Sequence, residues 1–464
     1  MLIRNALHRG DRIDLRIEAG RIAERGHELD PFDGPTYDAR GGELLPGLHD
    51  HHLHVQSLAA SLASVRCGPP TIRNRNALAE ALVAAEPIEG WIRGTGYFES
   101  VAGDLDRDEI DALRDDVPIR IQHRSGVLWF LNSKAIEALD LGGADRPGLE
   151  RDARGRITGR LFRADAWLRG HLPPTPAPDL ARVGRRLATY GVTSLTDCTP
   201  SNAAADYERL AKAHSTGALP QRLQVMGTLG LEQTCSRLPV GAHKIMLDEP
   251  ALPVFDALVA RIRAAHDEGR PVAFHAATRT ELHFALAALE SAGPVLGDRM
   301  EHASVAPPEA METLARLRVT VVTQPNFVRE RGDDYQRDVD ASDLPHLYRV
   351  KSWLDRGVPV RFGTDAPFGD PDPWAALEAA VERRTPDGQV LGEGEKVSPE
   401  EALLCFLEHD RSPTLGGFQE GDPADLCLLD RPWERARTRF SQVRVVQTWV
   451  GGDPLQADDD PSDA

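Results

Sequence analysis

Eight short apolar runs recur along the chain, and each closes on polar residues or glycine. Runs of this length, bounded by turn residues, are typical of buried strands. They cover residues 43–52, 191–197, 222–227, 243–247, 271–275, 299–303, 319–324 and 358–365.

The intervals between these runs carry a different pattern from the second run onward. In residues 254–269 the apolar positions recur three and four apart and stop at Gly269, which predicts an amphipathic helix. The same pattern appears in residues 308–318, 345–357 and 373–384. Strand–helix alternation repeated eight times predicts an α/β fold, a (β/α)8 barrel of the TIM type.

The first interval, residues 55–190, is too long for one crossover helix. We therefore expect a large insertion after barrel strand 1, over about residues 60–178. It contains a strand-then-helix pattern at residues 119–139 and a Gly- and Arg-rich turn at residues 151–161, and its end is proline-rich. An insertion at this point would lie beside the catalytic face, as a lid or a pocket wall.

The two ends of the chain share a third pattern of short alternating strands broken by Gly, Pro and Asp. Neither end is large enough to bury a core alone. We expect residues 1–45 and 405–455 to form one composite β-sandwich around a barrel domain of residues 46–404. The acidic residues 456–464 are expected to be a solvated tail.

Composition narrows the possible partners. The chain has 464 residues, 41% of them hydrophobic, and a formal net charge of −18. The excess of acid argues against nucleic acid and against an anionic membrane surface. No 18-residue apolar run predicts a membrane span, and no signal peptide is evident. The five cysteines are scattered without a C-x-x-C pair, which favours a reducing compartment and a cytoplasmic enzyme.

The strand ends carry the candidate chemistry, because catalytic groups of such barrels lie at the carboxyl ends of the strands. The first run closes on Asp50-His51-His52-Leu53-His54. Residues two apart face the same side of a strand, so His52 and His54 present two imidazoles together, while His51 points away. Asp50 is expected to orient a ligand imidazole.

Later runs extend this set with residue types that bind metals. They carry Lys244, His275, His302 and Asp365. Histidine and carboxylate groups from successive strands predict a metal site. A lysine is costly inside a barrel, so Lys244 indicates a special role, although a salt bridge or a plain ammonium remains open.

Several of these segments resemble the amidohydrolase superfamily. The motif PGLHDHHLH (residues 46–54) resembles its opening motif, and FHA, EHA and FGTDAP (residues 274–276, 301–303 and 362–367) resemble its later ligand strands. Residues 124–135, RSGVLWFLNSKA, and 243–249, HKIMLDE, are similar to the YtcJ-like branch, which groups with N-substituted formamide deformylases. One departure from the branch is Val127, which follows Gly126. Such relatives often have a histidine directly after this glycine.

The resemblance implies a site with two divalent metal ions, zinc above all. His52 and His54 would bind the first ion, carboxylated Lys244 would bridge the two, and a second ion would be bound by His275 and His302. Asp365 would bind the first ion and act as general base. The implied reaction is hydrolysis of an amide-like, non-peptide carbon–nitrogen bond of a small molecule by a metal-activated hydroxide. The family also implies a possible homodimer.

Four further residues are candidates for substrate binding, and each also has a structural alternative. Arg329, with Arg331, follows the seventh run, where it would bind a carboxylate in two-pronged fashion or lie in a solvated loop. Asp248 would bind an amine or cap a helix. Arg124 and Trp129 of the insertion would line the pocket, or Trp129 would be part of the core.

Two alternative functions remain open. A mononuclear, deaminase-type amidohydrolase would use His52, His54, His275 and Asp365, with His302 contacting substrate or water. A non-catalytic scaffold would have lost several ligands, whereas all six are present.

Overall fold

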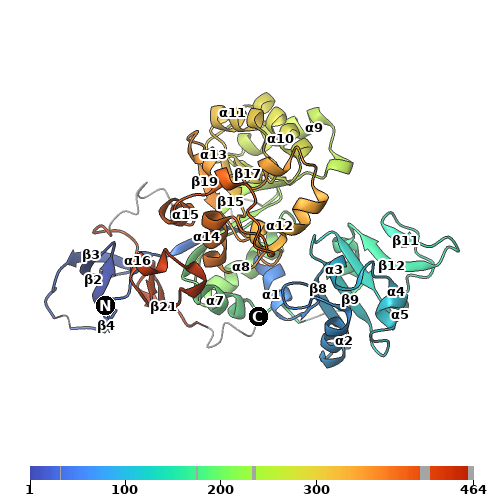
Figure 1. Cartoon of the computed structure of the whole chain (residues 1–464), viewed down its shortest axis with the longest axis horizontal. Helices are drawn as coiled ribbons and strands as arrows, with labels where there is room; N and C mark the ends of the chain where they lie inside the picture. Colours follow the sequence, from blue (N-terminus) through green and yellow to red (C-terminus); the bar gives the residue numbers. More distant parts are fainter. Residues whose placement is uncertain (32, 174–175, 232–236, 408–417, 458–464) are drawn as a thin grey trace. The chain divides into compact units, whose positions relative to one another are not determined.

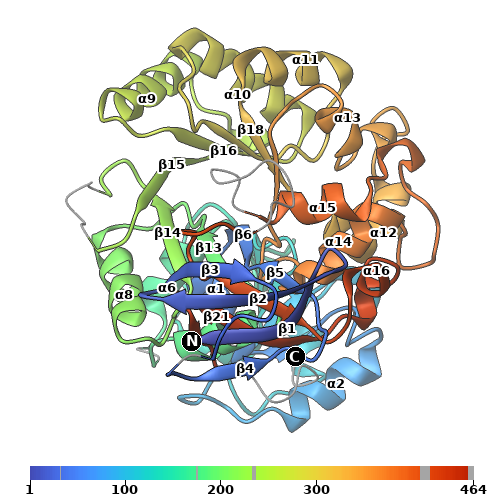
Figure 2. The same cartoon turned by 90° about the vertical axis from the view of Figure 1, so that its left-hand side faces the viewer.

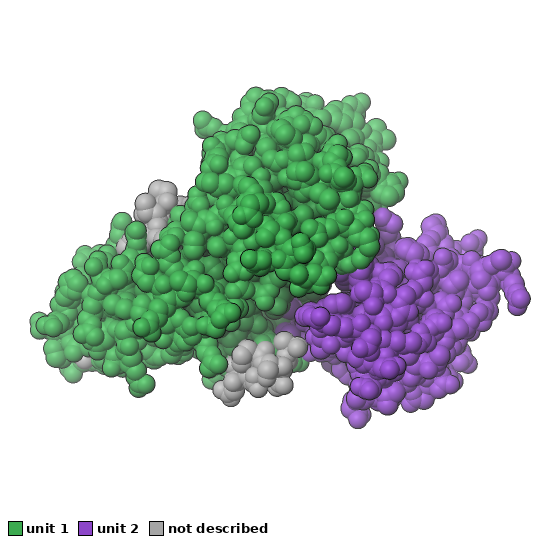
Figure 3. Space-filling view, viewed as in Figure 1, with its two compact units in different colours: residues 1–55, 180–464 green, residues 56–179 purple. Residues whose placement is uncertain are grey.

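The computed structural model describes the 464-residue chain except residues 32, 174–175, 232–236, 408–417 and 458–464. The chain forms two compact units, one of residues 1–55 with 180–464 and one of residues 56–179 (Figure 3). Most of the expected acidic tail lies outside the described residues. No helix within the described ranges is both long and apolar enough to cross a membrane.

The first unit contains a parallel sheet of eight strands, in the order β6-β13-β14-β15-β16-β17-β18-β19. Figure 1 labels β15, β17 and β19 of this sheet. Each strand coincides with one of the eight apolar runs, so the predicted barrel strands are confirmed. Their bounds are β6 (Leu48–Leu53), β13 (Val192–Asp197), β14 (Arg222–Gly227), β15 (Val240–Met246), β16 (Val272–Ala276), β17 (Arg299–His302), β18 (Thr320–Thr323) and β19 (Val360–Phe362).

The segment after β19 lies against β6 and nearly closes the barrel. The Asp365 N–H donates to the His52 carbonyl at 2.7 Å, and the His54 N–H donates to the Ala366 carbonyl at 2.8 Å. Gly363 permits this approach, because a Cβ there would lie 2.5 Å from the His52 nitrogen. First and last strands are therefore joined at the level of the candidate site.

Helices follow the strands as the alternation predicts. Figure 2 shows α9, α10 and α11 grouped outside the middle strands, and α10 packs on both neighbouring helices. The helices of this unit are α7 (Leu180–Ala188), α8 (Ala204–Ser215), α9 (Phe255–Asp267), α10 (Arg279–Ala292), α11 (Pro308–Leu317), α12 (Asn326–Asp338), α13 (Lys351–Leu354), α14 (Pro373–Glu382), α15 (Pro399–Cys405) and α16 (Trp433–Ala436).

Two helix predictions are wrong in this region. The helix expected over residues 345–357 is reduced to α13, because Tyr348 has a φ of 43° that a right-handed helix cannot contain. The charged segment after run seven, interpreted as a solvated loop, is the 13-residue helix α12. Phe327, Val328 and Gly332 of this helix are buried, whereas charged residues such as Arg329 and Arg337 are exposed.

The two chain ends share one small double-sheet assembly. Strands β1 (Leu2–His8), β2 (Asp11–Glu18), β3 (Arg21–Gly26) and β4 (Thr36–Asp38) form one sheet. The other joins β5 (Leu44–Pro46) to β20 (Leu426–Leu429), β21 (Val445–Val450) and β22 (Asp453–Pro454). One apolar cluster includes residues from both sheets, among them Ile3, Leu426 and Trp449.

Residues 56–179 form a unit with its own core. Its six strands lie in the order β11-β12-β10-β9-β8-β7 and enclose two apolar clusters with their helices. The strands are β7 (Val65–Arg66), β8 (Ile92–Tyr97), β9 (Ile119–His123), β10 (Leu128–Leu131), β11 (Leu149–Arg151) and β12 (Ile157–Phe162). The helices are α1 (Val55–Leu62), which begins at the boundary, α2 (Arg75–Ala84), α3 (Glu99–Ala102), α4 (Arg107–Asp111), α5 (Ser133–Ala138) and α6 (Asp165–His171).

Candidate metal centre

Two histidines from the end of β6 converge on one carboxylate. The Nε2 atom of His54 lies 3.2 Å from Asp365 Oδ1, and that of His52 lies 3.5 Å from the same oxygen. Strand alternation explains the pairing, since His51 faces the other way and stacks on His49 with ring centroids 3.9 Å apart. The three ligand atoms lie within 4.8 Å of one another, close enough to bind one ion together.

The backbone at two strand ends adopts a left-handed conformation. Asp365 has a φ of 57° and His302 a φ of 68°, values that cost energy in residues other than glycine. Such strain is concentrated at functional sites, where the surrounding structure enforces it. Here it turns both side chains toward His52.

Two more histidines continue the cluster across the barrel. The ring of His302 lies 4.8 Å from that of His52 and 4.5 Å from that of His275, measured between centroids. Nδ1 of His302 is 2.8 Å from Oε1 of Gln324, just beyond β18. Four imidazoles from β6, β16 and β17 therefore form a continuous row at the carboxyl ends of the strands.

Lys244 lies on β15 with only 2% of its surface exposed. Its Nζ atom is buried and has no hydrogen-bond partner among the described residues. Burial lowers its pKa, opposed by the negative charge of Glu301. Its neighbour His243 points outward, where Nε2 accepts a hydrogen bond from Arg261 of α9 at 2.7 Å. Lys244 thus faces the barrel interior.

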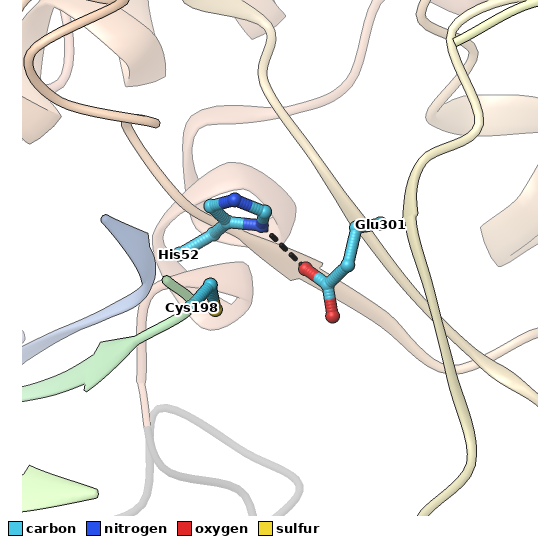
Figure 4. A group of neighbouring side chains, drawn as sticks. All are labelled: His52, Cys198 and Glu301. Carbon is cyan, nitrogen blue, oxygen red and sulfur yellow. Dashed lines mark hydrogen bonds and ion pairs between the residues drawn. The ribbon is translucent and has the colours of Figure 1, made fainter. Parts of the chain in front are cut away.

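The structure also places a buried ion pair behind His52, which the sequence analysis missed. His52 Nδ1 lies 2.5 Å from Glu301 Oε2 (Figure 4). Arg299 binds both oxygens of Glu301, at 2.7 Å and 3.1 Å. A signal existed, because two opposite charges spaced two apart on a barrel strand share one face. Glu301 therefore holds the His52 ring and leaves Nε2 directed at Asp365.

Cys198, after β13, lies with His52 and Glu301 in a second group of possible ligands (Figure 4). Two facts argue against a metal there. Burial raises the pKa of the Cys198 thiol well above its usual range, which disfavours the thiolate that binds metals. The facing atoms of Glu301 and His52 already bind each other and Arg299. We therefore regard Cys198 as a packing residue.

The charge states of the first group suit a cation. Burial, with the charge of Lys244, lowers the pKa of His52 to about 3, so its imidazole is neutral. Burial would raise the pKa of Asp365, but contacts with His54, His52 and His302 hold it below its usual range. Neutral imidazoles and an ionised carboxylate are what a divalent metal requires.

Several buried polar atoms at the site lack a hydrogen-bond partner among the described residues, and they indicate whether the site suits a metal ion. His52 Nε2, Asp365 Oδ1 and Lys244 Nζ are buried and have no hydrogen-bond partner among the described residues. Buried polar atoms are rarely left unpaired, and each such case requires an explanation. The unpartnered imidazole nitrogen and carboxylate oxygen, with His54 in the same group of ligand atoms, fit a bound divalent ion.

Two acidic residues near the site have structural roles. Asp50 accepts hydrogen bonds from Thr364, at 3.0 Å from its N–H and 2.5 Å from its hydroxyl, and from the His52 N–H at 3.1 Å. It ties β6 to the segment after β19, so the expectation that it orients an imidazole is wrong. Asp197 accepts from the Val55 N–H at 2.7 Å.

The four substrate-binding candidates lie in different places. Arg329 is exposed on α12 and pairs with Glu378 at 2.9 Å. Asp248 is half-buried beyond β15. Arg124 and Trp129 belong to the unit of residues 56–179, where Arg124 covers the Phe98 ring. Trp129 is buried there, and its indole N–H donates to Asp165 at 2.9 Å.

A cavity of about 320 Å³ lies at the opposite end of the strands. Val240, Pro271, Arg299 and Thr320, which lie at the amino ends of four barrel strands or just before them, are among the residues that line it. None of the six expected ligands does. This cavity is therefore separate from the histidine row.

Comparison with known proteins agrees with this geometry. The family model described as "Amidohydrolase family" matches residues 35–456. The N-substituted formamide deformylase of Arthrobacter pascens is 26% identical, over 94% of this chain and 93% of the relative. YtcJ of Bacillus subtilis (strain 168) is 23% identical, over 89% of this chain and 88% of the relative.

The fold is also found in solved structures. An uncharacterized metal-dependent hydrolase from Pyrococcus furiosus superposes with a TM-score of 0.70 at 22% identity, over 93% of this chain and 99% of that chain. The chain therefore belongs to the amidohydrolase family, in the branch of YtcJ and the formamide deformylase, and is a hydrolase of carbon–nitrogen bonds other than peptide bonds.

Proposed function

We propose that this protein hydrolyses an amide-like bond of a small molecule at the site formed by His52, His54 and Asp365. The convergence of the two Nε2 atoms on Asp365 Oδ1, at 3.5 Å and 3.2 Å, is the observation that carries the proposal. A divalent metal ion, when bound, lowers the pKa of a water molecule and polarises the scissile carbonyl.

Asp365 is the general base of this proposal. Its low pKa keeps the carboxylate ionised, and Oδ1 faces the space between the histidines. It takes the proton of the attacking water and passes it to the leaving nitrogen. The strained backbone and the hydrogen bond from Asp365 N–H to the His52 carbonyl hold the carboxylate in place.

The six-ligand, two-ion site extends this proposal to Lys244, His275 and His302. Lys244 would carry a carbamate, which replaces a buried cation with an anionic bridge. Its unpartnered Nζ inside the barrel supports this role, as does the proximity of the His275 and His302 rings. Zinc suits such nitrogen and oxygen donors.

A mononuclear, deaminase-type site is the second candidate. Among the described His, Cys, Asp and Glu residues, His52, His54 and Asp365 form one group of three ligand atoms, which is sufficient for a single ion. In this version His302 contacts the substrate or the water, and Lys244 remains an ammonium facing Glu301.

The relatives suggest the substrate class. The relative from Arthrobacter pascens is named a deformylase of N-substituted formamides. We propose N-acyl amines with a small acyl group as the first class to test.

The four described cysteines are all buried and form no disulfide, which supports our proposal of a cytoplasmic enzyme. Cys235 lies outside the described residues.

Metal content per chain, measured by elemental analysis after purification without chelator, tests the proposal. We expect two zinc-like ions in the wild type and one or none in Lys244→Ala, with hydrolysis of N-formyl amines lost on chelation. One ion in both proteins favours the mononuclear site. No ion in either after metal reconstitution contradicts the proposal.

A further inference from the structure

We propose that Arg331 binds a carboxylate of the substrate, so that the preferred substrates are N-acyl amino acids or similar acidic amides. This inference deepens the proposed function and rests on it. From the sequence, Arg329 and Arg331 are both candidates for this role, with a solvated loop as the alternative; the structure distinguishes the two arginines of α12.

Arg329 and Arg331 have different environments. The side chain of Arg329 is 45% exposed and already pairs with Glu378. Arg331 turns inward, with its guanidinium 4.1 Å above the Phe327 ring. Residues two apart on a helix lie on different faces, which accounts for this divergence. Only Arg331 is therefore directed toward the barrel.

Among the described residues, Arg331 has no anion paired with it in a salt bridge. It forms no salt bridge with any residue in the described ranges, and its single hydrogen bond there goes to the Phe368 carbonyl. Its neighbour Glu330 is not a full counter-charge, because burial raises the pKa of that carboxyl to about 7. The remaining guanidinium N–H groups are thus available to a ligand, and a planar fork matches a carboxylate.

Short connections place Arg331 beside the candidate metal site. Phe368, which accepts its hydrogen bond, follows Asp365 by three residues and packs its ring 5.4 Å from that of His54. Phe327, beneath the guanidinium, packs against Tyr348 at 5.7 Å, and the Tyr348 N–H donates to the Ser304 carbonyl, two residues after His302. Arg331 and the aromatic residues that it contacts therefore lie beside the strand ends that carry Asp365 and His302.

Two tyrosines complete the subsite. The hydroxyls of Tyr335 and Tyr348 lie 3.1 Å apart, so one donates to the other and the second keeps its hydrogen for an anion. Burial alone would lower the pKa of Arg331, but Tyr335, Glu330 and other neighbours raise it, so the guanidinium stays charged. A fixed cation beside a hydroxyl donor favours an anionic ligand group over a neutral one.

Matched substrate pairs test the inference. N-formyl derivatives of phenylalanine, leucine and glycine are compared with the corresponding N-formyl amines, which lack only the carboxylate. We expect the wild type to favour the acids in kcat/KM, and Arg331→Gln to lose about 10- to 100-fold on the acids alone, chiefly through KM. Arg337→Gln, an exposed residue of α12 paired with Asp334 and Asp338, is the matched control and keeps the preference.

Other results would overturn the inference. Equal rates on both members of each pair in the wild type would do so, as would an acid preference retained in Arg331→Gln. A merely structural role would lower kcat on acids and amines alike. If Arg331→Gln does not fold, Arg331→Lys keeps the charge without the planar fork, and we expect it to lose at least tenfold on the acids.

Ligand binding separates failure of this inference from failure of the proposed function. Thermal unfolding of the chelator-treated protein is measured with N-formylphenylalanine and with N-formyl-2-phenylethylamine. We expect only the acid to raise Tm, in the wild type but not in Arg331→Gln. A Tm rise without hydrolysis would contradict the proposed function alone, whereas hydrolysis without any carboxylate-dependent rise would contradict the Arg331 subsite.

Discussion

His52 uses both of its ring nitrogens, and this arrangement organises the site at the scale of single residues. Nδ1 binds Glu301, itself held by Arg299, while Nε2 faces Asp365. A carboxylate behind a ligand histidine fixes the tautomer and raises the basicity of the coordinating nitrogen. Because Arg299 and His52 Nδ1 bind the Glu301 carboxylate, its negative charge is compensated behind the ring and is not directed at the space where the metal would bind.

Replacement of either histidine of the β6 pair is expected to abolish binding of the first metal ion. His52→Ala and His54→Ala each remove one of the three ligands of the group that includes Asp365, so turnover should fall to background while the fold persists. Metal analysis and far-UV circular dichroism measure both effects. His283→Ala, an exposed histidine of α10, serves as control. Normal activity in either site variant would contradict the assignment.

Glu301→Gln tests whether Glu301 positions the His52 ring, as opposed to binding the metal ion itself. The amide keeps the size of the side chain but loses the charge that holds Arg299 and the His52 ring. We expect metal affinity to fall about 10- to 100-fold, a typical cost of losing such a partner. A chelator competition titration measures it, and exposed Glu309→Gln should be unchanged. Wild-type affinity in Glu301→Gln would show that the ion pair serves folding alone.

At the scale of elements, the site depends on the contact between the first and last barrel strands. His52 and His54 lie on β6 and Asp365 lies just beyond β19, so their meeting requires the two backbones to approach closely. Gly363 and the hydrogen bonds from Asp365 and His54 make that approach possible.

Gly363→Ala should therefore disrupt both closure and metal binding. Its Cβ would lie 2.5 Å from the His52 nitrogen, a backbone atom that cannot move aside. We expect a loss of about 1–3 kcal/mol in the free energy of unfolding, as for other overpacked sites, and weaker metal binding. Urea denaturation measures the first. Gly394→Ala, with open space around its Cβ, should behave as wild type; equal stability of both variants would contradict this account.

At the scale of the whole molecule, the two chain ends form a double-sheet assembly with an apolar cluster of its own. Trp449 of β21 is almost fully buried in the cluster that contains Ile3 and Leu426. The cluster contains none of the candidate ligands. We therefore expect substitutions in this cluster to change the stability of the protein without changing its metal binding.

Trp449→Ala is expected to lower the free energy of unfolding by about 3–5 kcal/mol, the range for removal of a buried aromatic ring. Metal content per folded chain should stay at the wild-type value. Urea denaturation and elemental analysis of the folded fraction measure these quantities. A loss of metal in protein that remains folded would mean that the terminal sheets and the site are coupled.

The sequence by itself determined the barrel strands and the residue types at their ends. A strand alternates with period two and a buried run is apolar, so both features are local and visible in one chain. The two wrong predictions also arise from reading local pattern alone. The many charged residues of α12 suggest a loop although the helix has buried residues, and the helix expected over residues 345–357 is interrupted by the backbone conformation of Tyr348.

Only the tertiary structure decided which side chains meet. Glu301 and Arg299 lie behind His52 because β17 and β6 face each other across the barrel, and Arg331 rather than Arg329 turns inward because of how α12 packs. Asp50 likewise binds Thr364, more than 300 residues away, in place of an imidazole. Such contacts depend on barrel closure and helix rotation, which are set by packing between segments far apart in the chain.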